Sequence, residues 1–399
     1  MPESCDTCGI ALDNIKIAVE MRDLNAVIAH TNVAYCMECG KCTSTCPVAL
    51  VNSNFSPRKI VSRTISGGGI SLLTSQHIFA CLTCGLCNHH CPSDVYFVEF
   101  IRHVRELAGI KGNKASCSHG GALQSIMRLM TAPKMKQNRL EWVTDDLKIA
   151  RKGEYLFFVG CLPYYDSYFA DLELSSLNIA KSTVRLLNKL DIVPAVSNDE
   201  RCCGHDLRWA GDTGMFKLLA HRNAEILSKT GATKIITSCA ECFRTLKLDY
   251  PDYVDFPFEV FHISEFIAKA IDNKKLQFKN ANINATYHDP CRLSRHTDII
   301  DAPRKALKAI EGLKLNEMTH HGKRSNCCGT SSWINCDIHS KMIQVSRLKE
   351  AKDTNADLLI TSCPKCMIHF KCAQKDAKNA VKLAIDIKDL TEVISENVQ

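Results

Sequence analysis

The sequence lacks a long hydrophobic run. No stretch of the 399 residues reaches the roughly 18 uncharged apolar residues that a membrane-spanning helix needs. Its first residues, Met1 to Gly9, lack the basic segment followed by an apolar run that marks a secretory signal. We therefore expect a chain with no transmembrane segment of its own that works in the reducing cytoplasm.

Length and charge narrow the class of protein further. A chain of 399 residues with 45% hydrophobic and 23% charged residues is typical of a globular protein of two or three domains. The formal charge of +7 counts cysteine as neutral, whereas a cubane cluster on four thiolates carries about −2. The excess of Lys and Arg therefore indicates an ordinary surface or a docking face, and not nucleic-acid binding.

Cysteine is the abundant residue. Twenty-three cysteines in a small secreted protein would indicate a disulfide framework. Here they lie in a large chain and in clusters too tight to cross-link distant elements, which favours metal or iron–sulfur ligation.

Two matching cysteine runs lie in the first hundred residues, and each ends in Cys-Pro. The spacing CxxCxxCxxxCP is that of two-cluster ferredoxins, in which three cysteines of a run bind one cluster and the fourth binds the other. A pair of zinc sites is the alternative, but zinc would leave the third cysteine of each run unused. The spacing predicts one [4Fe-4S] cubane on Cys36, Cys39, Cys42 and Cys91, and a second on Cys81, Cys84, Cys87 and Cys46.

The segment between the runs predicts an α-helical ferredoxin domain. It has 34 residues, with helices expected at 57–64 and 72–79 on either side of the glycines at 67–69. A further helix is expected at 95–107. We place this domain at residues 31–110, after an extension at 1–30 with Cys5 and Cys8, and before a linker at 111–152 that contains the lone Cys117.

A second cysteine pattern occurs twice in the rest of the chain. Each copy has one cysteine, then Cys-Cys-Gly, then CxxC, and the segments Ile236–Cys239 and Ile360–Cys363 have the same sequence. Strands are expected at 155–159, 234–238, 285–288 and 357–361, and helices at 177–190, 216–229, 304–310 and 339–352. The repeat predicts two α/β domains, 153–280 and 281–399, related by an approximate two-fold axis.

The paired motif indicates an unusual cluster. Functional groups of open α/β domains gather beyond the carboxyl ends of the strands, where each copy carries its cysteines. We expect Gly204 and Gly329 to let the backbone pass close to a bulky inorganic core. Five thiolates exceed the four corners of a cubane, which implies a larger, opened or bridged iron–sulfur assembly. The two sets are Cys161, Cys202, Cys203, Cys239 and Cys242, and Cys291, Cys327, Cys328, Cys363 and Cys366.

In this order of motifs the chain resembles the CCG-domain family, and within it the D-type chains of heterodisulfide reductase. Those chains are similar to a fusion of the ferredoxin chain of the reductase with its catalytic chain. The resemblance covers residues 30 to 380. It implies two noncubane [4Fe-4S] clusters on the two five-cysteine sets, which cleave the disulfide between coenzymes M and B. Electrons would arrive singly through the two cubanes.

The resemblance also allows a second function. Similar chains resemble electron relays in larger complexes, such as benzoyl-CoA reductases or respiratory assemblies, without a disulfide substrate of their own. The implied partners are a membrane cytochrome b, which would hold the chain at the inner face of the membrane, or soluble flavin and iron–sulfur subunits. A zinc-based structural or nucleic-acid-binding protein is the third alternative.

Several other residues lie near the motifs. His205 and the pair His288-Asp289 are candidate proton donors, or else structural hydrogen-bonding residues. Arg292, Arg295 and Lys365 are candidates for binding anionic substrate groups or for neutralising cluster charge. Trp209 and Trp333, at matching positions after each Cys-Cys pair, are expected in the core. Cys336 and Cys372 have no counterparts in the first copy, which argues against ligand roles for them.

Overall fold

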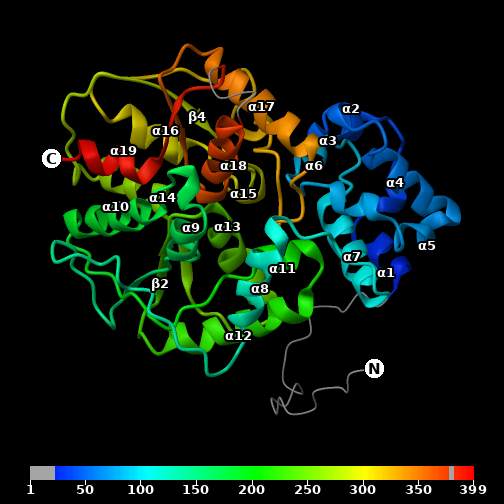
Figure 1. The fold of residues 1–399 in the computed structure, drawn as a ribbon, viewed down its shortest axis with the longest axis horizontal. Coiled ribbons are helices and arrows are strands. Elements are labelled where there is room, and N and C mark those ends of the chain that lie inside the picture. The colour runs from blue at the N-terminus through cyan, green and yellow to red at the C-terminus, as the bar shows by residue number, and fades with distance from the viewer. Residues whose placement is uncertain (1–22, 377–381) are drawn as a thin grey trace.

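The computed structural model describes residues 23–376 and 382–399, so the Cys5 and Cys8 motif lies outside the described residues. The first part is a group of short helices, seen in blue in Figure 1. Asp23 and Ser56 cap the first and fourth of these helices with their side-chain oxygens. The helices are α1 (Leu24–His30), α2 (Lys41–Ser44), α3 (Pro47–Val51), α4 (Pro57–Arg63), α5 (Gly69–Leu72), α6 (Leu86–His89) and α7 (Phe97–Ile110).

The helix expected at 72–79 is present only in part. Helix α5 ends at Leu72, and a separate 3-10 helix, Gln76–Ala80, begins after Ser75, whose hydroxyl accepts the backbone N–H of His77. A serine hydroxyl that satisfies a backbone donor locally removes the advantage of continuing the helix. The helices expected at 57–64 and 95–107 are present as α4 and α7.

The remainder of the chain contains two parallel sheets. The first has the strand order β1-β2-β3 and the second the order β5-β4-β6-β7. Ala195 bridges β1 on the side away from β2, the place that β5 takes beside β4 in the second sheet. The strands are β1 (Tyr155–Phe157), β2 (Lys234–Thr237), β3 (Glu259–His262), β4 (Ile283–His288), β5 (Leu313–Leu315), β6 (Leu358–Thr361) and β7 (Asp386–Asp389).

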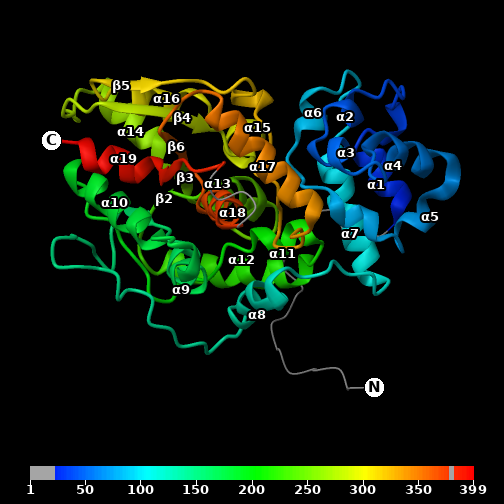
Figure 2. The ribbon, with the colours of Figure 1, turned by 45° about the horizontal axis from the view of Figure 1, so that its top comes forward.

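Helices cover both sheets and pack the two repeats together, as Figure 2 shows. Helix α10 of the first repeat packs against α19 of the second, and α14 of the first against α16 of the second. The expected helices are present with ends that differ by up to three residues. The helices are α8 (Ala122–Leu129), α9 (Leu162–Tyr168), α10 (Ser176–Lys189), α11 (His205–Ala210), α12 (Thr213–Ser228), α13 (Ala240–Arg244), α14 (Ile263–Asp272), α15 (Cys291–Thr297), α16 (Asp301–Lys308), α17 (Ile338–Lys352), α18 (Pro364–Lys375) and α19 (Leu390–Asn397).

The helical N-terminal part is joined to the α/β part through buried contacts. Arg105 of α7 is fully buried and donates hydrogen bonds to the carbonyl oxygens of Ile78, Cys81 and Trp209. Helix α17 also packs against α3. Arg105 therefore links α7 both to the second cysteine run and to α11 of the first repeat.

Within the described ranges, none of the helices is both long enough and apolar enough to cross a membrane.

Gly211 permits the close approach of α11 to α7 and provides a test of this junction. Its φ is +91°, and an added Cβ would lie 2.6 Å from the backbone carbon of Arg105. Gly231 has a similar φ of +70° with open space around it. We expect Gly231→Ala to cost about 1 kcal/mol, the left-handed strain alone, and Gly211→Ala to cost clearly more, measured as anaerobic thermal midpoints. Equal losses would contradict a role for the close approach.

Candidate functional site: two five-cysteine clusters

The five cysteines of the first repeat converge in the fold. Cys161 follows β1 and Cys239 follows β2, and the Cys202-Cys203 pair precedes α11. The thiols contact one another in a series, Cys161 with Cys202, Cys202 with Cys203, Cys203 with Cys242, and Cys242 with Cys239. The hydrogen bond between Cys239 and Cys242 lowers the pKa of Cys239 to about 5, whereas the hydrogen bonds with Cys203 and Cys239 raise the pKa of Cys242, so the proton of this pair lies on Cys242.

The second repeat has the same series at the ends of β4 and β6. The contacts join Cys291 with Cys327, Cys327 with Cys328, Cys328 with Cys366, and Cys366 with Cys363. Among the cysteines of the described residues none forms a disulfide. Each repeat thus gathers five reduced sulfurs at one place.

The two cysteine series meet. The thiol of Cys239 contacts that of Cys363, so the two CxxC motifs lie against each other. At the other end of the second series, Cys327 contacts Cys84 of the N-terminal helical part. The contact with Cys327 lowers the pKa of Cys84 to about 6. The sulfurs therefore form a continuous sequence from Cys84 through the second repeat to the first.

The eight cysteines of the N-terminal runs lie in two groups. Electrostatic neighbours of Cys42 are Cys36, Cys39 and Cys91, and those of Cys87 include Cys81, Cys84 and Cys46. Cys39 is exposed, whereas Cys46, Cys81, Cys84 and Cys87 are buried. One group therefore lies at the surface, and the other lies between it and the second repeat.

Each of the two N-terminal cysteine loops contains two residues whose backbone is in the left-handed conformation. Glu38 and Gly40 have positive φ in the first loop, and Thr83 and Gly85 have positive φ in the second. This backbone places three cysteines on one tight turn, and Gly40 and Gly85 then begin α2 and α6.

The expectation that Gly204 and Gly329 leave room for a bulky inorganic core is wrong. Both have positive φ, but an added Cβ on Gly204 would meet the Phe216 ring of α12 at 2.8 Å. On Gly329 it would meet the Ser340 carbonyl oxygen of α17, also at 2.8 Å. These glycines are required by the backbone turn and by the following helix, and their missing side chains point toward protein.

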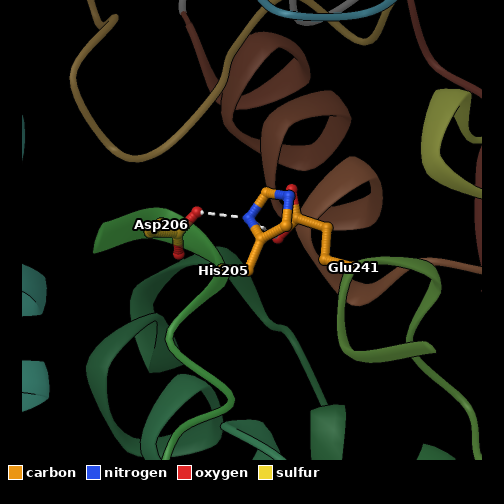
Figure 3. Close-up of side chains that lie close together, drawn as sticks. All are labelled: His205, Asp206 and Glu241. Atoms are coloured by element: carbon orange, nitrogen blue, oxygen red, sulfur yellow. Dashed lines mark hydrogen bonds and ion pairs between the residues drawn. The ribbon is translucent and has the colours of Figure 1, made fainter. Parts of the chain in front are cut away.

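A buried ionic network joins Lys365 of the second CxxC motif to Asp206 and to Glu241 of the first CxxC motif. Figure 3 shows three of its side chains, His205, Asp206 and Glu241. His205 Nδ1 lies 2.9 Å from an Asp206 oxygen, and the Lys365 ammonium pairs with both Asp206 and Glu241. Burial raises the pKa of Asp206, but Lys365 and His205 outweigh this and hold it below its usual value. The His205, Asp206 and Glu241 ligand atoms lie within 4.8 Å of one another, but the Lys365 ammonium already supplies the positive charge there.

Sequence reasoning missed Asp206 and Glu241. A signal was present, because the first CxxC contains Glu241 where the second contains Lys365, and opposite charges at matching positions of a repeat indicate pairing. It also missed Glu200, which is fully buried and accepts hydrogen bonds from Arg139, Val159 N and Gly160 N. Glu200 holds the end of β1 next to the Cys-Cys pair.

The candidate anion-binding residues are engaged inside the protein. Arg292 donates to the carbonyl and hydroxyl oxygens of Thr83 and to His205 Nε2. Arg295 donates to the carbonyl oxygens of Cys84, Lys323 and Ser325. Both guanidinium groups lower the pKa of Cys84 and of Cys291. The geometry therefore favours the second alternative, neutralisation of thiolate charge, over substrate binding.

The candidate proton donors have structural partners. His205 is buried, its Nδ1 faces Asp206, and its Nε2 accepts from Arg292. Asp289 pairs with Arg304 and accepts from Gly322 N. His288 Nδ1 accepts from Arg347, and burial lowers the pKa of His288 to about 3. Its Nε2 is buried and has no hydrogen-bond partner.

The two tryptophans are in the core, whereas the remaining cysteines lie partly or fully at the surface. Trp209 and Trp333 are buried, as expected, and each packs under a cation, Arg292 over Trp209 and Lys365 over Trp333. Cys117 and Cys336 are exposed, and Cys372 contacts the Lys341 ammonium.

The Lys365 network provides a stability test. Lys365→Met leaves two buried carboxylates without their cation, and breaking a buried pair in this way costs about 3 to 5 kcal/mol. Lys305, whose pair with Asp272 is at the surface, is the matched control, and Lys305→Met should cost about 1 kcal/mol or less. Anaerobic thermal unfolding measures both. Similar losses in the two variants would contradict the assignment of Lys365 as the cation of this network.

Comparison with protein-family models identifies both parts of the chain. Residues 32–95 match the 4Fe-4S dicluster domain, and residues 155–247 and 285–371 each match the cysteine-rich CCG domain. The chain therefore has an N-terminal iron–sulfur domain followed by a duplicated CCG domain.

Curated relatives cover almost the whole chain. The D-type chain of dihydromethanophenazine:CoB–CoM heterodisulfide reductase from Methanosarcina barkeri is 31% identical over 95% of both chains. The B-type chain of fumarate reductase (CoM/CoB) from Methanothermobacter marburgensis is 29% identical over 87% of this chain and 70% of that protein.

A solved structure shares the fold. The crystal structure of a hypothetical protein from Helicobacter pylori matches 93% of this chain and 76% of its own, with a TM-score of 0.53 and 12% identity. With the family matches and the relatives above, the chain belongs to the CCG-domain iron–sulfur oxidoreductases related to the D-type chain of heterodisulfide reductase.

Proposed function

We propose that the chain reduces a disulfide to two thiols with electrons that pass through two cubane clusters to two noncubane [4Fe-4S] clusters. The observation that supports this proposal best is the continuous sequence of sulfurs, in which Cys84 contacts Cys327 and Cys363 contacts Cys239. The likeness to the D-type chain of CoB–CoM heterodisulfide reductase supports the coenzyme M and coenzyme B disulfide as the substrate.

The residues fit these clusters. Each repeat offers five converging thiols, and the buried Nε2 of His288 lacks the partner that a cluster sulfur would provide. When bound, such clusters supply single electrons at potentials set by their surroundings. Cys36, Cys39, Cys42 and Cys91 would hold the outer cubane, and Cys81, Cys84, Cys87 and Cys46 the inner one. The noncubane clusters would be held by Cys161, Cys202, Cys203, Cys239 and Cys242, and by Cys291, Cys327, Cys328, Cys363 and Cys366.

The order of the cluster sites in the structure indicates the direction in which electrons would flow. Cys39 of the outer group is exposed, and Cys84 of the inner group touches the second repeat. Electrons would therefore reach the second repeat first and the first repeat last. Arg292 and Arg295 lie beside Cys84 and Cys291 and would lower the cost of placing negative charge there.

The two repeats would be related by an approximate two-fold axis. Helix α10 corresponds to α16 and α14 to α19 in the repeat, and the observed contacts are α10 with α19 and α14 with α16. Exchange of the two repeats leaves this pair of contacts unchanged, as expected of a two-fold arrangement.

One observation favours the alternative function, an electron relay within a larger complex. The buried cations beside the cysteines, Arg292, Arg295 and Lys365, are engaged by the protein's own oxygen and nitrogen atoms. An anionic substrate would need other cations to bind.

A redox partner would dock over the outer cubane. The exposed side chains of Tyr35 and Met37 lie beside Cys36 and Cys39, with exposed fractions of 71% and 66%. Exposed apolar surface next to an outer cluster suits transient contact with another redox protein. A membrane cytochrome b would place the chain at the inner face of the cytoplasmic membrane, whereas flavin or iron–sulfur subunits would keep it in the cytoplasm.

Anaerobic purification and dye-driven turnover test the function. The protein should be coloured, contain iron and no stoichiometric zinc, and cleave the coenzyme heterodisulfide when a reduced viologen is supplied. Added thiol should change the paramagnetic spectrum of the oxidised protein. Intact clusters with neither turnover nor a thiol effect would support the relay. Iron well below four atoms per chain would contradict both redox functions.

Two cysteine substitutions distinguish a cluster ligand from a cysteine that is not a ligand. Cys328→Ser should remove one of the noncubane spectra and at least tenfold of the disulfide-reducing rate, because Cys328 lies within the second series. Cys372→Ser, in α18 of the same repeat, is the control, and it should retain both. Retention of the signal in Cys328→Ser would contradict the ligand assignment.

A further inference from the structure

His288 holds a hydrogen-bond donor that the rest of the described structure does not use. Its ring is 1% exposed at the carboxyl end of β4, three residues before Cys291. Nδ1 accepts a hydrogen bond of 3.1 Å from Arg347 Nε, so the ring proton is on Nε2. The Nε2–H group is fully enclosed and has no acceptor.

Arg347 fixes this tautomer, because its guanidinium is held from several sides. It donates to the Glu350 carboxylate at 2.6 Å, to the His320 carbonyl oxygen at 2.9 Å and to the Ser325 hydroxyl at 3.1 Å. A guanidinium group always donates, so Nδ1 remains the acceptor. If the imidazole ring flipped, Arg347 Nε would lose its acceptor, and a second buried group would be left unpaired.

The groups around the ring include one aromatic ring and several charged side chains. The Phe370 ring packs edge-on against it with a centroid distance of 4.9 Å, and the charges that act on it include Cys328, Asp289, Arg347 and Arg295. Asp289 is occupied by Arg304 and Gly322 N. Cys328 is therefore the neighbour that offers an acceptor.

We infer that His288 Nε2–H donates a hydrogen bond to a sulfur of the second-repeat cluster at Cys328 and raises the reduction potential of that cluster. An unpaired buried donor costs about 1 to 3 kcal/mol, so a cluster sulfur beside Nε2 would stabilise the folded protein. A hydrogen bond to cluster sulfur stabilises the more negative, reduced form. His288 is thus a positioning and tuning residue and not a ligand.

At the position that matches His288, the first repeat has no donor. The residue three positions before Cys161 is Phe158, which is fully buried and has no polar atom in its side chain. Two sites that share five cysteines and a fold therefore differ at this position. The second cluster would be the easier one to reduce, which suits the site next to Cys84. This inference rests on the proposed cluster content of the two repeats.

Redox titration of the purified holoprotein tests the inference without substrate. The signal of the second-repeat cluster is first assigned by its loss in Cys328→Ser. His288→Phe, which copies the first repeat, should shift the oxidised-to-reduced ratio of that signal at least tenfold toward oxidised, equivalent to about 59 mV for a one-electron couple. His288→Gln keeps an acceptor for Arg347 and a donor N–H, and it should stay near the wild-type potential.

A second histidine controls for the substitution itself. His221 in α12 also has a buried Nε2 without a partner, and its charged neighbours are Glu225 and Lys217, with no cysteine among them. His221→Phe should leave every potential unchanged. Labelling with 15N-histidine adds a second readout: a magnetic coupling from a histidine nitrogen should appear in the reduced cluster spectrum and be lost in His288→Phe, which distinguishes His288 from His369, the other histidine near Cys328.

The outcomes separate this inference from the proposed function. Absence of the clusters in the wild-type protein would overturn both. Intact clusters with an unchanged potential in His288→Phe and no nitrogen coupling would overturn the role of His288 alone. An equal shift in His288→Phe and His288→Gln would also overturn it, since the loss would then not follow the donor.

Discussion

The contact between α15 and the second N-terminal cysteine loop determines how the molecule is connected. Arg292 and Arg295 on this helix donate to Thr83 and to the Cys84 carbonyl, and Gly85 leaves room for His296 of the same helix. The loop backbone is itself in the left-handed region at Thr83. These bonds hold Cys84 against Cys327 and thereby set which of the two cysteine series lies next to the second N-terminal cysteine run.

The duplication has been modified at the interface between the repeats. The CxxC motifs meet through Cys239 and Cys363, and there Lys365 of the second repeat pairs with Asp206 and Glu241 of the first. A buried ion pair adds little net stability, but its members must stay together because a lone buried charge is costly. The pairing therefore joins the two repeats while they keep the same cysteine framework.

The cysteine motifs predicted the iron–sulfur character and the helical and α/β parts, because ligand spacing and strand ends are local properties of sequence. The roles of Arg292, Arg295 and His205 could not be derived in this way, since Thr83 and Cys84 reach the two arginines, and Arg292 reaches His205, only through tertiary packing. Gly204 shows the same limit, because its constraint comes from Phe216 in the next helix. The Glu241 and Lys365 pairing was visible when the two repeats are aligned but needed the fold to bring the motifs together.

The central claim is that electrons reach the second repeat before the first. The most direct measurement is rapid mixing of the oxidised protein with an excess of a reduced low-potential dye, followed by freeze-quenching at successive times and paramagnetic spectroscopy. The account predicts that the signal assigned to the cluster at Cys327 and Cys328 appears first and that the signal of the first repeat follows. Reduction of the first-repeat cluster before the second would contradict it.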